Sequence, residues 1–504
     1  MPDDQGQRTT AQRGTARGTY GGPGALFGGV FGRGVRLGDE AWLQAMLDAE
    51  AGLARALERA GIAHAGSGAA VTRTAVARNF DAAELGELAA LTGNPVPGLS
   101  RLLARAVAET DSGAARAVHR GATSQDIIDT AAMLLARKAI DAMLADLESA
   151  AERAAALADA HRDTVMIGRT LLQQAVPVTF GVTAAGWLSG LDAAVTGLIT
   201  AKNTRLAVQF GGAAGTLASL GERGPRVAAL LAEELGLANP PLPWHTERLR
   251  MIDVATAMAR VTAATGKIAR DVTLLAQTEV GEVSEGPAGN SPADNSNKPR
   301  RGGSSAMPHK NNPVASVAIL GCARQVPGLL ATLMASAEQE HQRAAGAWHA
   351  EWQPFTSIAN LASSAAAWTD ELMAGLRVDT ARMTANLTAS GGLPLAERVT
   401  SLLAGTLGGP RAHDVVATAA ARAVSSGLPL RDVLAADPEI TAADVSAERI
   451  EEALDPAGYL GAAGEFVTAA LRAHEGARNE LADNRRDRGY RAVKSDNSNK
   501  QARD

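Results

Sequence analysis

The sequence predicts an all-α protein built around a bundle of long helices. Of its 504 residues, 46% are hydrophobic but only 3% are aromatic, and the apolar residues are largely Ala, Leu and Val. Ala and Leu lose little side-chain entropy in a helix, whereas strands favour aromatic and β-branched residues. Five long apolar stripes at helical spacing support the same conclusion. We therefore expect three domains, with a central five-helix bundle between two smaller helical domains.

The first part of the chain predicts an arm followed by a helical domain. Residues 1–24 are polar and rich in Gly, Arg and Thr, which indicates a disordered arm. Residues 25–125 are expected to form the N-terminal helical domain. Its first long helix should begin with Asp39 as N-cap and end at Gly61. The apolar stripe of this helix consists of Trp42, Met46, Ala49, Leu53 and Leu57.

The central part, residues 126–377, carries the long stripes. The first runs from Asp129 to about Leu157 without Pro or Gly, and such a helix of about thirty residues would span roughly 45 Å. Pro177 is expected in the first turn of the second helix, which continues through Leu206. The other three stripes cover about 251–283, 313–345 and 351–376.

The end of the chain predicts a small domain and a tail. Residues 378–478 show shorter helical patterns separated by glycine-containing turns at Gly391-Gly392 and Gly408-Gly409, so we expect a small C-terminal helical domain. Residues 479–504 are highly charged and are expected to be loose.

The overall composition excludes several classes of protein. A net charge of −5 gives no sign of a nucleic-acid partner. One cysteine, Cys322, excludes an intramolecular disulfide framework and fits a cytoplasmic protein. Without an uninterrupted run of about 18 apolar residues, no membrane partner is expected. Nine histidines without a regular i, i+4 pair predict no transition-metal site, and no cofactor is expected.

The most unusual segment is the loop from Gly302 to Pro313, GGSSAMPHKNNP. Its paired glycines permit backbone conformations that other residues avoid. Its serines supply hydroxyl groups, and Lys310 supplies a positive charge. A serine can act as a base if its alkoxide is stabilised, which a nearby lysine and oriented amides can do. The alternative is a flexible Gly/Ser linker, which the complete twelve-residue string disfavours.

This loop resembles the GSSxMPxKxNP motif of the fumarase/aspartase superfamily. Residues 119–126, HRGATSQD, resemble the first motif of that family, HxGxTSxD. Residues 168–177, 209–216 and 348–352 are most similar to its 3-carboxy-cis,cis-muconate cycloisomerase branch. The resemblance extends over about residues 26–475. It implies a three-domain fumarase/aspartase-type fold and a homotetramer in which each active site draws residues from three subunits.

The resemblance also implies a shared chemistry. A base removes a proton from the carbon beside a carboxylate of a small dicarboxylate-type substrate, and the bond on the neighbouring carbon then breaks, usually releasing fumarate. Preorganised donors must hold the charged intermediate. The implied catalytic residues are Ser305 as base, Lys310 and His119. The implied substrate-binding residues are Thr123, Ser124, Gln173, Ser304, Met307, Asn312, Arg343 and Arg248.

Several charged side chains have a structural interpretation beside the functional one. His119 could be a hydrogen-bonded structural histidine, and His309 could stabilise the loop. His245 could lie behind the residues that touch substrate. Glu282 and Glu285, which precede the loop, are expected to be solvated.

Four features bear on the substrate, and the last three are departures from the branch. Leu171 occupies the position where many members of the superfamily have a catalytic histidine, which the cycloisomerase branch also lacks. Asn311 replaces a usual Arg, and Glu247 replaces a usual Gln, so the positive potential near the pocket is lower. The segment of about residues 286–301, which adjoins the loop, is longer than is usual in this branch. These changes favour elimination of nitrite from nitrosuccinate, whose leaving group needs no strong acid. The alternatives are a 3-carboxy-cis,cis-muconate cycloisomerase, another fumarate-releasing lyase, or a catalytically silent structural homologue.

Overall fold

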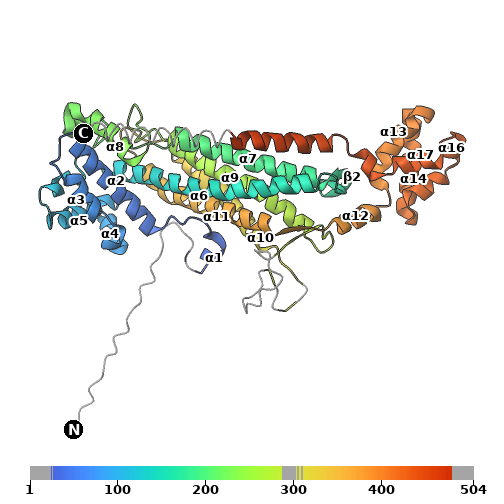
Figure 1. Ribbon diagram of the computed structural model, residues 1–504, viewed down its shortest axis with the longest axis horizontal. Helices are drawn as coiled ribbons and strands as arrows, with labels where there is room; N and C mark the ends of the chain where they lie inside the picture. Colours follow the sequence, from blue (N-terminus) through green and yellow to red (C-terminus); the bar gives the residue numbers. More distant parts are fainter. Residues whose placement is uncertain (1–23, 25, 287–301, 304–305, 308–309, 480–504) are drawn as a thin grey trace, which may run out of the picture. The chain divides into compact units, whose positions relative to one another are not determined.

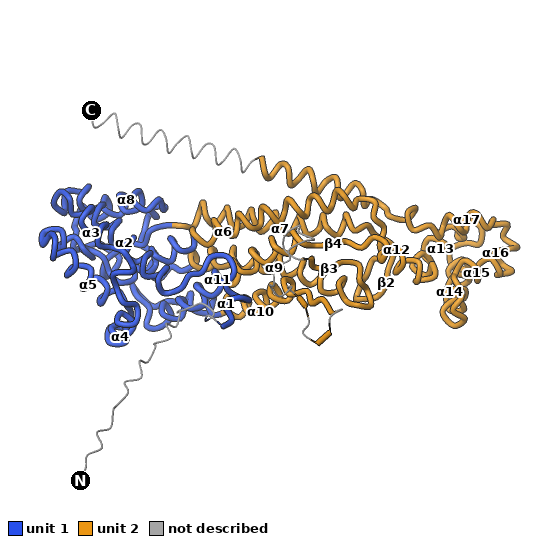
Figure 2. Tube along the Cα trace, turned by 60° about the horizontal axis from the view of Figure 1, so that its bottom comes forward, with its two compact units in different colours: residues 1–136, 207–248, 332–360 blue, residues 137–206, 249–331, 361–504 orange. Residues whose placement is uncertain are grey.

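The computed structural model describes residues 24, 26–286, 302–303, 306–307 and 310–479. Most of the predicted arm and tail therefore lie outside the described residues, as do nearly all of the 286–301 segment and Ser304, Ser305 and His309. The chain divides into two compact units, coloured separately in Figure 2. Unit 1 comprises Met1–Ala136, Ala207–Arg248 and Thr332–Asn360, and unit 2 comprises Arg137–Leu206, Leu249–Ala331 and Leu361–Asp504.

Unit 1 contains the shorter helices of the first part of the chain. In order they are α1 (Gly28–Phe31), α2 (Asp39–Arg59), α3 (Ser67–Thr74), η1 (Ala77–Asn79), α4 (Ala82–Thr92), α5 (Val96–Ala108), η2 (Ala114–Ala117), η3 (Ala218–Arg223) and α8 (Gly224–Leu235).

The expected stripe of α2 is buried at Met46, Ala49, Leu53 and Leu57. Its cap differs from the prediction. Gly38 is the N-cap and makes no side-chain hydrogen bond to the helix, while Asp39 lies in the first helical turn. There its negative charge interacts favourably with the helix dipole.

The five long helices are confirmed, and with them the all-α class. They are α6 (Ser124–Ala160), α7 (Phe180–Thr204), α9 (Leu249–Leu275), α10 (Val314–Ala335) and α11 (Ala347–Gly375). Within unit 2 these helices run alongside one another, and α7 packs directly on α9 (Figure 1). Their cores are rich in Ala and Leu, which permits close approach of the helix axes.

Pro177 does not open a helix. It lies in β2 (Gln173–Thr179), which pairs antiparallel with β1 (Val165–Thr170), opposite Ile167. Valines flank Pro177 and favour a strand. The helix α7 begins only after Thr179, whose hydroxyl accepts a hydrogen bond from the Val182 N–H.

Two long helices end earlier than their stripes suggested. α9 ends at Leu275, and the turn that follows includes Gly281, with a φ of 63°, before the short strand β3 (Val283–Glu285). β3 pairs antiparallel with β4 (Leu376–Val378). At the end of α10, the Ser336 hydroxyl donates to the Thr332 carbonyl and satisfies one of the last acceptors of the helix.

The last part of unit 2 forms a cluster of short helices. They are α12 (Thr380–Ala389), η4 (Leu393–Leu395), α13 (Ala396–Leu407), α14 (Gly409–Ser426), α15 (Leu430–Ala435), α16 (Pro438–Ala442), α17 (Ala447–Ala453) and η5 (Pro456–Tyr459), followed by helical residues 463–479. A separate hydrophobic core includes Val399, Leu403, Val416, Leu434 and Ile450. The three-domain division stays a prediction.

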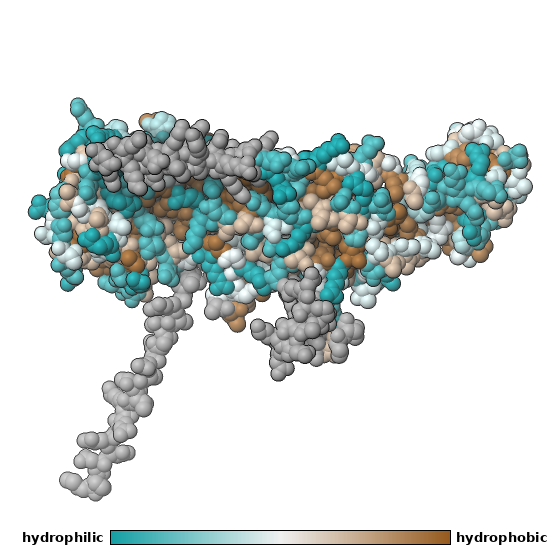
Figure 3. Space-filling view, in the orientation of Figure 1, coloured by the Kyte–Doolittle hydropathy of each residue, from teal (hydrophilic) through white to brown (hydrophobic). Residues whose placement is uncertain are grey.

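Within the part of the chain that the structure describes, two helices, α7 and α10, are long and apolar enough to cross a membrane by length and composition alone. Core helices of bundles pass the same test, and α7 is packed against α9. Figure 3 shows apolar surface interspersed with polar side chains over the long helices.

Candidate active site

The first candidate segment, residues 119–126, is held by hydrogen bonds between its own residues at the start of α6. The Thr123 N–H donates to Oδ2 of Asp126 at 3.0 Å, and the Asp126 N–H donates to the Thr123 carbonyl at the same distance. This reciprocal pair satisfies amide groups that a helix start leaves free. Thr123 and Ser124 are partly exposed there, at a helix end that attracts anions. Their expected role in carboxylate binding fits this location.

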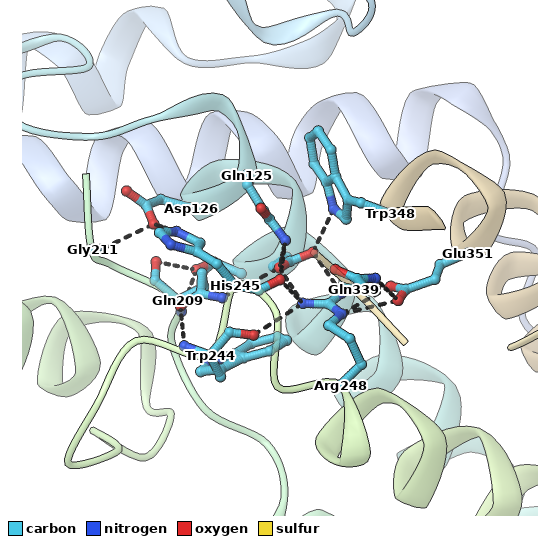
Figure 4. Close-up of polar contacts among 12 residues, drawn as sticks. Gln125, Asp126, Gln209, Gly211, Trp244, His245, Arg248, Gln339, Trp348 and Glu351 are labelled. Carbon is cyan, nitrogen blue, oxygen red and sulfur yellow. Dashed lines mark hydrogen bonds and ion pairs between the residues drawn. The ribbon is translucent and has the colours of Figure 1, made fainter. Parts of the chain in front are cut away.

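The buried carboxylate of Asp126 joins three segments that are far apart in sequence (Figure 4). Besides the Thr123 amide, it accepts hydrogen bonds from the N–H groups of Gly211 and Gly212, each at 2.9 Å. Nε2 of His245 lies 2.7 Å from Oδ1. Because an ionised carboxylate only accepts, Nε2 of His245 carries the proton. His245 is 4% exposed and therefore lies behind the surface that a substrate could reach.

Glycine is required in the segment that Asp126 holds. Gly212 has a φ of 69°, and a Cβ atom there would lie 2.9 Å from the Gly121 carbonyl oxygen. A Cβ atom on Gly211 would lie 2.8 Å from Cε1 of His245. The backbone of this segment can therefore approach the first motif closely only because both side chains are absent.

A second buried network lies next to Asp126, around Arg248 (Figure 4). Nη1 of Arg248 lies 2.7 Å from Oδ2 of Asp129, and Nη2 lies 2.5 Å from Oε2 of Glu351. The Arg248 side chain is 1% exposed. Burial lowers the pKa of Arg248, but the charges of the two carboxylates outweigh burial and raise it above its ordinary value. The guanidinium is thus enclosed by protein carboxylates in this chain, and its expected role in substrate binding stays a prediction.

Gln125 links this network to Arg343. Its amide donates to Oδ2 of Asp129 at 3.1 Å and to the His245 carbonyl at 2.8 Å. These bonds leave Oε1 of Gln125 to accept from Nη1 of Arg343 at 3.3 Å. Nη2 of Arg343 donates to the Ala213 carbonyl at 3.0 Å. Arg343 is only partly buried, and a guanidinium held this way remains available to an anion.

His119 is held by a carboxylate that the sequence did not single out. Oε2 of Glu50 accepts the His119 backbone N–H at 2.9 Å, and Oε1 lies 2.7 Å from Nδ1 of the ring. Glu50 lies on α2 and is 0% exposed. Burial lowers the pKa of His119, but the hydrogen bond and charge of Glu50, with the charge of Asp126, outweigh burial and raise it.

The loop from Gly302 to Pro313, called the serine loop below, belongs to unit 2. Its described ends are fixed to each other. The backbone N–H and the side-chain amide of Asn312 both donate to the Gly302 carbonyl, at 2.8 and 3.2 Å. The amide of Asn311 donates to the backbone carbonyl of Glu285 at 3.1 Å. Asn311 therefore anchors the base of the loop. Met307 and Lys310 are exposed, and Ser304 and Ser305 lie outside the described residues.

Glu282 and Glu285 are buried and hydrogen-bonded, not solvated. The Glu285 carboxylate accepts the N–H groups of Ala315 and Ser316 at 2.9 Å and the Ser316 hydroxyl at 2.7 Å, so it caps the start of α10. Glu282 pairs with Arg169 through two N–H···O bonds of 2.8 Å. These carboxylates hold the segments on either side of the loop in place.

The hairpin between β1 and β2 presents Gln173 and two leucines. Gln173 begins β2 and has an exposed side chain. Leu171 and Leu172 form the turn and are 96% and 73% exposed. Both have positive φ, 50° and 65°, which is unusual for residues other than glycine.

The predicted site residues thus fall into two groups. His119, Thr123, Ser124, Arg343 and Arg248 belong to unit 1, where Asp126 joins the motif of residues 119–126 to Gly211, Gly212 and His245. Gln173, Ser304, Ser305, Met307, Lys310 and Asn312 belong to unit 2. Among the described residues, no hydrogen bond joins Gln173 to the serine loop.

Sequence reasoning missed Glu50, Gln125, Asp129 and Glu351. A usable signal existed for Glu50, which is the one charged residue in the otherwise apolar run from Ala49 to Ala54. Gln125 and Asp129 are four residues apart and therefore share one face of α6. In the part of the chain that the structure describes, no group of three or more His, Cys, Asp or Glu residues could hold a metal ion.

Comparisons with known proteins agree with the fold. Residues 99–328 match the family described as Lyase, and residues 392–470 match the adenylosuccinate lyase C-terminus. A 3-carboxy-cis,cis-muconate cycloisomerase from Bradyrhizobium diazoefficiens is 46% identical, covering 86% of this chain and 94% of that protein. A nitrosuccinate lyase from Streptomyces davaonensis is 43% identical, covering 86% and 90%.

Solved structures extend the similarity to three dimensions. The crystal structure of the 3-carboxy-cis,cis-muconate lactonizing enzyme from Pseudomonas putida has a TM-score of 0.81 and 40% identity, covering 90% of this chain and 99% of that one. The all-α fold agrees with these relatives. The chain therefore belongs to the fumarase/aspartase superfamily and is a lyase of that superfamily.

Proposed function

We propose that the protein interconverts 3-carboxy-cis,cis-muconate and its lactone. The similarity to cycloisomerases carries this proposal, since two of them are 46% and 44% identical over 86% of the chain. The positively charged groups suit a substrate with several carboxylates. Arg343 and the start of α6 supply positive potential in unit 1, and Lys310 supplies it in unit 2.

In the lactone-forming direction, a carboxylate oxygen of the substrate adds to one carbon of a double bond. The neighbouring carbon, which lies beside a second carboxylate, takes up one proton. The reaction releases nothing, and its reverse is an elimination. In this proposal Ser305 exchanges that proton, and Lys310 stabilises the serine alkoxide and the charged intermediate. Thr123, Ser124, Gln173, Ser304, Met307, Asn312 and Arg343 bind the substrate.

Nitrosuccinate elimination, which the sequence favoured, is the second candidate. The nitrosuccinate lyase relative supports it, and so does Leu171 at the position of a missing acid. The substitution at Asn311 gives this candidate less support. The Asn311 side chain donates a hydrogen bond to the Glu285 backbone carbonyl. This substitution therefore acts on the base of the loop instead of through direct contact with the substrate.

A substrate comparison separates the candidates. Purified protein is given each compound in turn, and lactone, nitrite and fumarate are measured. Lactone formation without nitrite release supports the cycloisomerase. Efficient release of nitrite and fumarate from nitrosuccinate, with little lactone, would make the protein a nitrosuccinate lyase. Fumarate release from argininosuccinate or adenylosuccinate alone would point to a third member of the superfamily.

Variants of the loop test the mechanism with the preferred substrate. Ser305→Ala should lower kcat by about 1,000-fold or more, since it removes the base. Lys310→Ala should lower it by about 100-fold, since it removes a charge that stabilises the intermediate. Ser401→Ala, on the exposed face of α13, is the matched control and should leave kcat unchanged. Activity of Ser305→Ala near that of the parent would identify another base.

We also propose a homotetramer with active sites shared between subunits. The apolar helix α10 leaves Val317 and Met334 58% and 56% exposed in the single chain, and association would cover them. Analytical ultracentrifugation measures the mass. Mixing two impaired variants, Ser305→Ala and His119→Ala, should raise activity well above that of either alone if the site draws on different subunits. A fully active monomer would contradict the proposal. The protein is proposed to act in the cytoplasm, without membrane or nucleic-acid partners.

A further inference from the structure

Resting on the proposed function, we propose that Glu50 is the positioning residue of His119. It fixes the ring so that Nδ1 carries a proton and Nε2 is the nitrogen that exchanges a proton or hydrogen bond with the substrate. No motif of the sequence includes Glu50. The proposal rests on the contacts between this carboxylate and His119.

The two contacts together determine the ring geometry. Oε2 of Glu50 accepts the backbone N–H of His119 at 2.9 Å, while Oε1 lies 2.7 Å from Nδ1. One carboxylate therefore holds both the main chain and the ring of the same residue. An ionised carboxylate can only accept hydrogen bonds, so Nδ1 must be the donor. Among the described residues no other group bonds to the His119 ring, and its second nitrogen, Nε2, stays available.

The surroundings of the pair suit a functional histidine better than a packing residue. The Glu50 side chain is 0% exposed, whereas the His119 side chain is 25% exposed. The carboxylate is thus buried on α2, and the histidine extends from it toward solvent. His119 also has a φ of 55°, in the left-handed region that residues other than glycine avoid. Such strain persists where the surrounding structure enforces it, often at functional positions.

The position of His119 connects the pair to the substrate-handling segment. His119 is four residues before Thr123, and its carbonyl accepts the Ala122 N–H at 3.3 Å. The charge of Asp126 adds to that of Glu50 at the ring. Both carboxylates favour the charged ring, so His119 should hold a proton at higher pH than an ordinary histidine.

Glu50→Gln tests this without a large change of shape. Gln can still accept the His119 backbone N–H, but its amide would face Nδ1 as a donor, which moves the ring proton to Nε2. We expect the pKa of His119 to fall by about one unit or more and kcat to fall by about tenfold to 100-fold. The limb of the pH–rate profile that belongs to His119 should move to lower pH by the same amount.

The pKa of each histidine is measured by hydrogen–deuterium exchange at Cε1, read by mass spectrometry, which needs no substrate. Asp111→Asn is the matched control, because Asp111 lies 3.3 Å from Nε2 of the exposed His64 in the same unit. It should leave the pKa of His119 and kcat unchanged. The double variant Glu50→Gln/His119→Ala should match His119→Ala alone within about twofold, since Glu50 acts through the histidine.

The outcomes are distinct from those of the substrate assay. An unchanged pKa of His119 in Glu50→Gln overturns the inference, whichever compound is turned over. A lowered pKa with unchanged kcat, or a double variant far worse than His119→Ala, also overturns it. If Glu50→Gln does not fold, the parent decides the matter, because a His119 pKa at or below 6.5 contradicts the pairing. If neither compound reacts, the proposed function fails, while the exchange data still support or reject the pair.

Discussion

Nη1 and Nη2 of Arg169 each donate to a separate oxygen of Glu282, both at 2.8 Å. Glu282 is 0% exposed, and its Oε1 also accepts the amide of Asn386 at 2.8 Å. The pair joins β1 to the segment that leads into the serine loop. The hydrogen bond from Asn386 connects α12 to the same carboxylate. A carboxylate that forms three hydrogen bonds in a buried position organises the structure around it.

We predict that Glu282→Ala lowers the free energy of unfolding by about 2–4 kcal/mol, because it leaves a partly buried guanidinium without its partner. Urea unfolding of the purified variant measures the change. Glu439→Ala is the control, because the pair of Glu439 with Arg411 is exposed, and it should not move the midpoint measurably. A midpoint for Glu282→Ala equal to that of the control would show that the pair contributes nothing.

Arg248 gives a prediction that separates a structural role from substrate binding. Arg248→Lys keeps the charge but cannot reach Asp129 and Glu351 at once, since an ammonium lacks the planar fork. We expect a loss of about 2–4 kcal/mol in the free energy of unfolding and a KM within a few-fold of the parent. Chemical denaturation and steady-state kinetics on the folded variant test both parts. A large rise in KM at unchanged stability would identify Arg248 as a substrate contact.

The turn of the β1–β2 hairpin predicts a trade between stability and activity. Leu171 and Leu172 both have positive φ, whereas Asn-Gly adopts such a turn with little strain. The double substitution Leu171→Asn/Leu172→Gly should raise the free energy of unfolding by about 1–2 kcal/mol. It should lower activity if the exposed leucines face the substrate or a neighbouring subunit.

Thermal unfolding and kcat/KM report on the two parts of that prediction. Leu242→Asn is the control, since Leu242 is similarly exposed at 73% but lies outside the hairpin. A less stable double variant would show that the two leucines are not strained. A more stable variant with full activity would remove the turn from the functional site.

Asp146 predicts a pH dependence of stability. Burial, and then the charge of Asp370, raise the pKa of Asp146 from 3.8 to about 6. The folded protein therefore holds this proton more tightly than the unfolded chain does. Its contribution to stability is present at low pH and is lost as the pH rises from about 4 through 6.

The substitution Asp146→Asn should consequently stabilise the protein more at pH 8 than at pH 5. We expect a difference on the order of 1 kcal/mol, allowing for the partial exposure of the side chain. Urea midpoints at the two pH values measure it. Asp159→Asn, at a side chain 66% exposed, is the control and should show no such difference. An equal effect of Asp146→Asn at both pH values would contradict a raised pKa.

Much of the fold followed from local patterns in the sequence. The apolar stripe of α6 predicted a helix that the structure extends from Ser124 to Ala160, because helical periodicity repeats within a few residues. The ends of the helices were less predictable. Pro177 fits a first helical turn by its φ, yet it lies in β2 opposite Ile167, and only pairing with another strand decides between the two.

The candidate site shows the same division. The sequence by itself determined the family, the serine loop and the motif around Thr123, because these are runs of residues recognised by identity. Only the tertiary structure decided which side chains meet. Glu50 and His119 are 69 residues apart in the sequence, and the ion-paired residues Arg248 and Glu351 are 103 residues apart. Burial makes such partnerships obligatory, since a charge inside the protein must be paired, but the partner is chosen by the packing of helices that the sequence pattern does not specify.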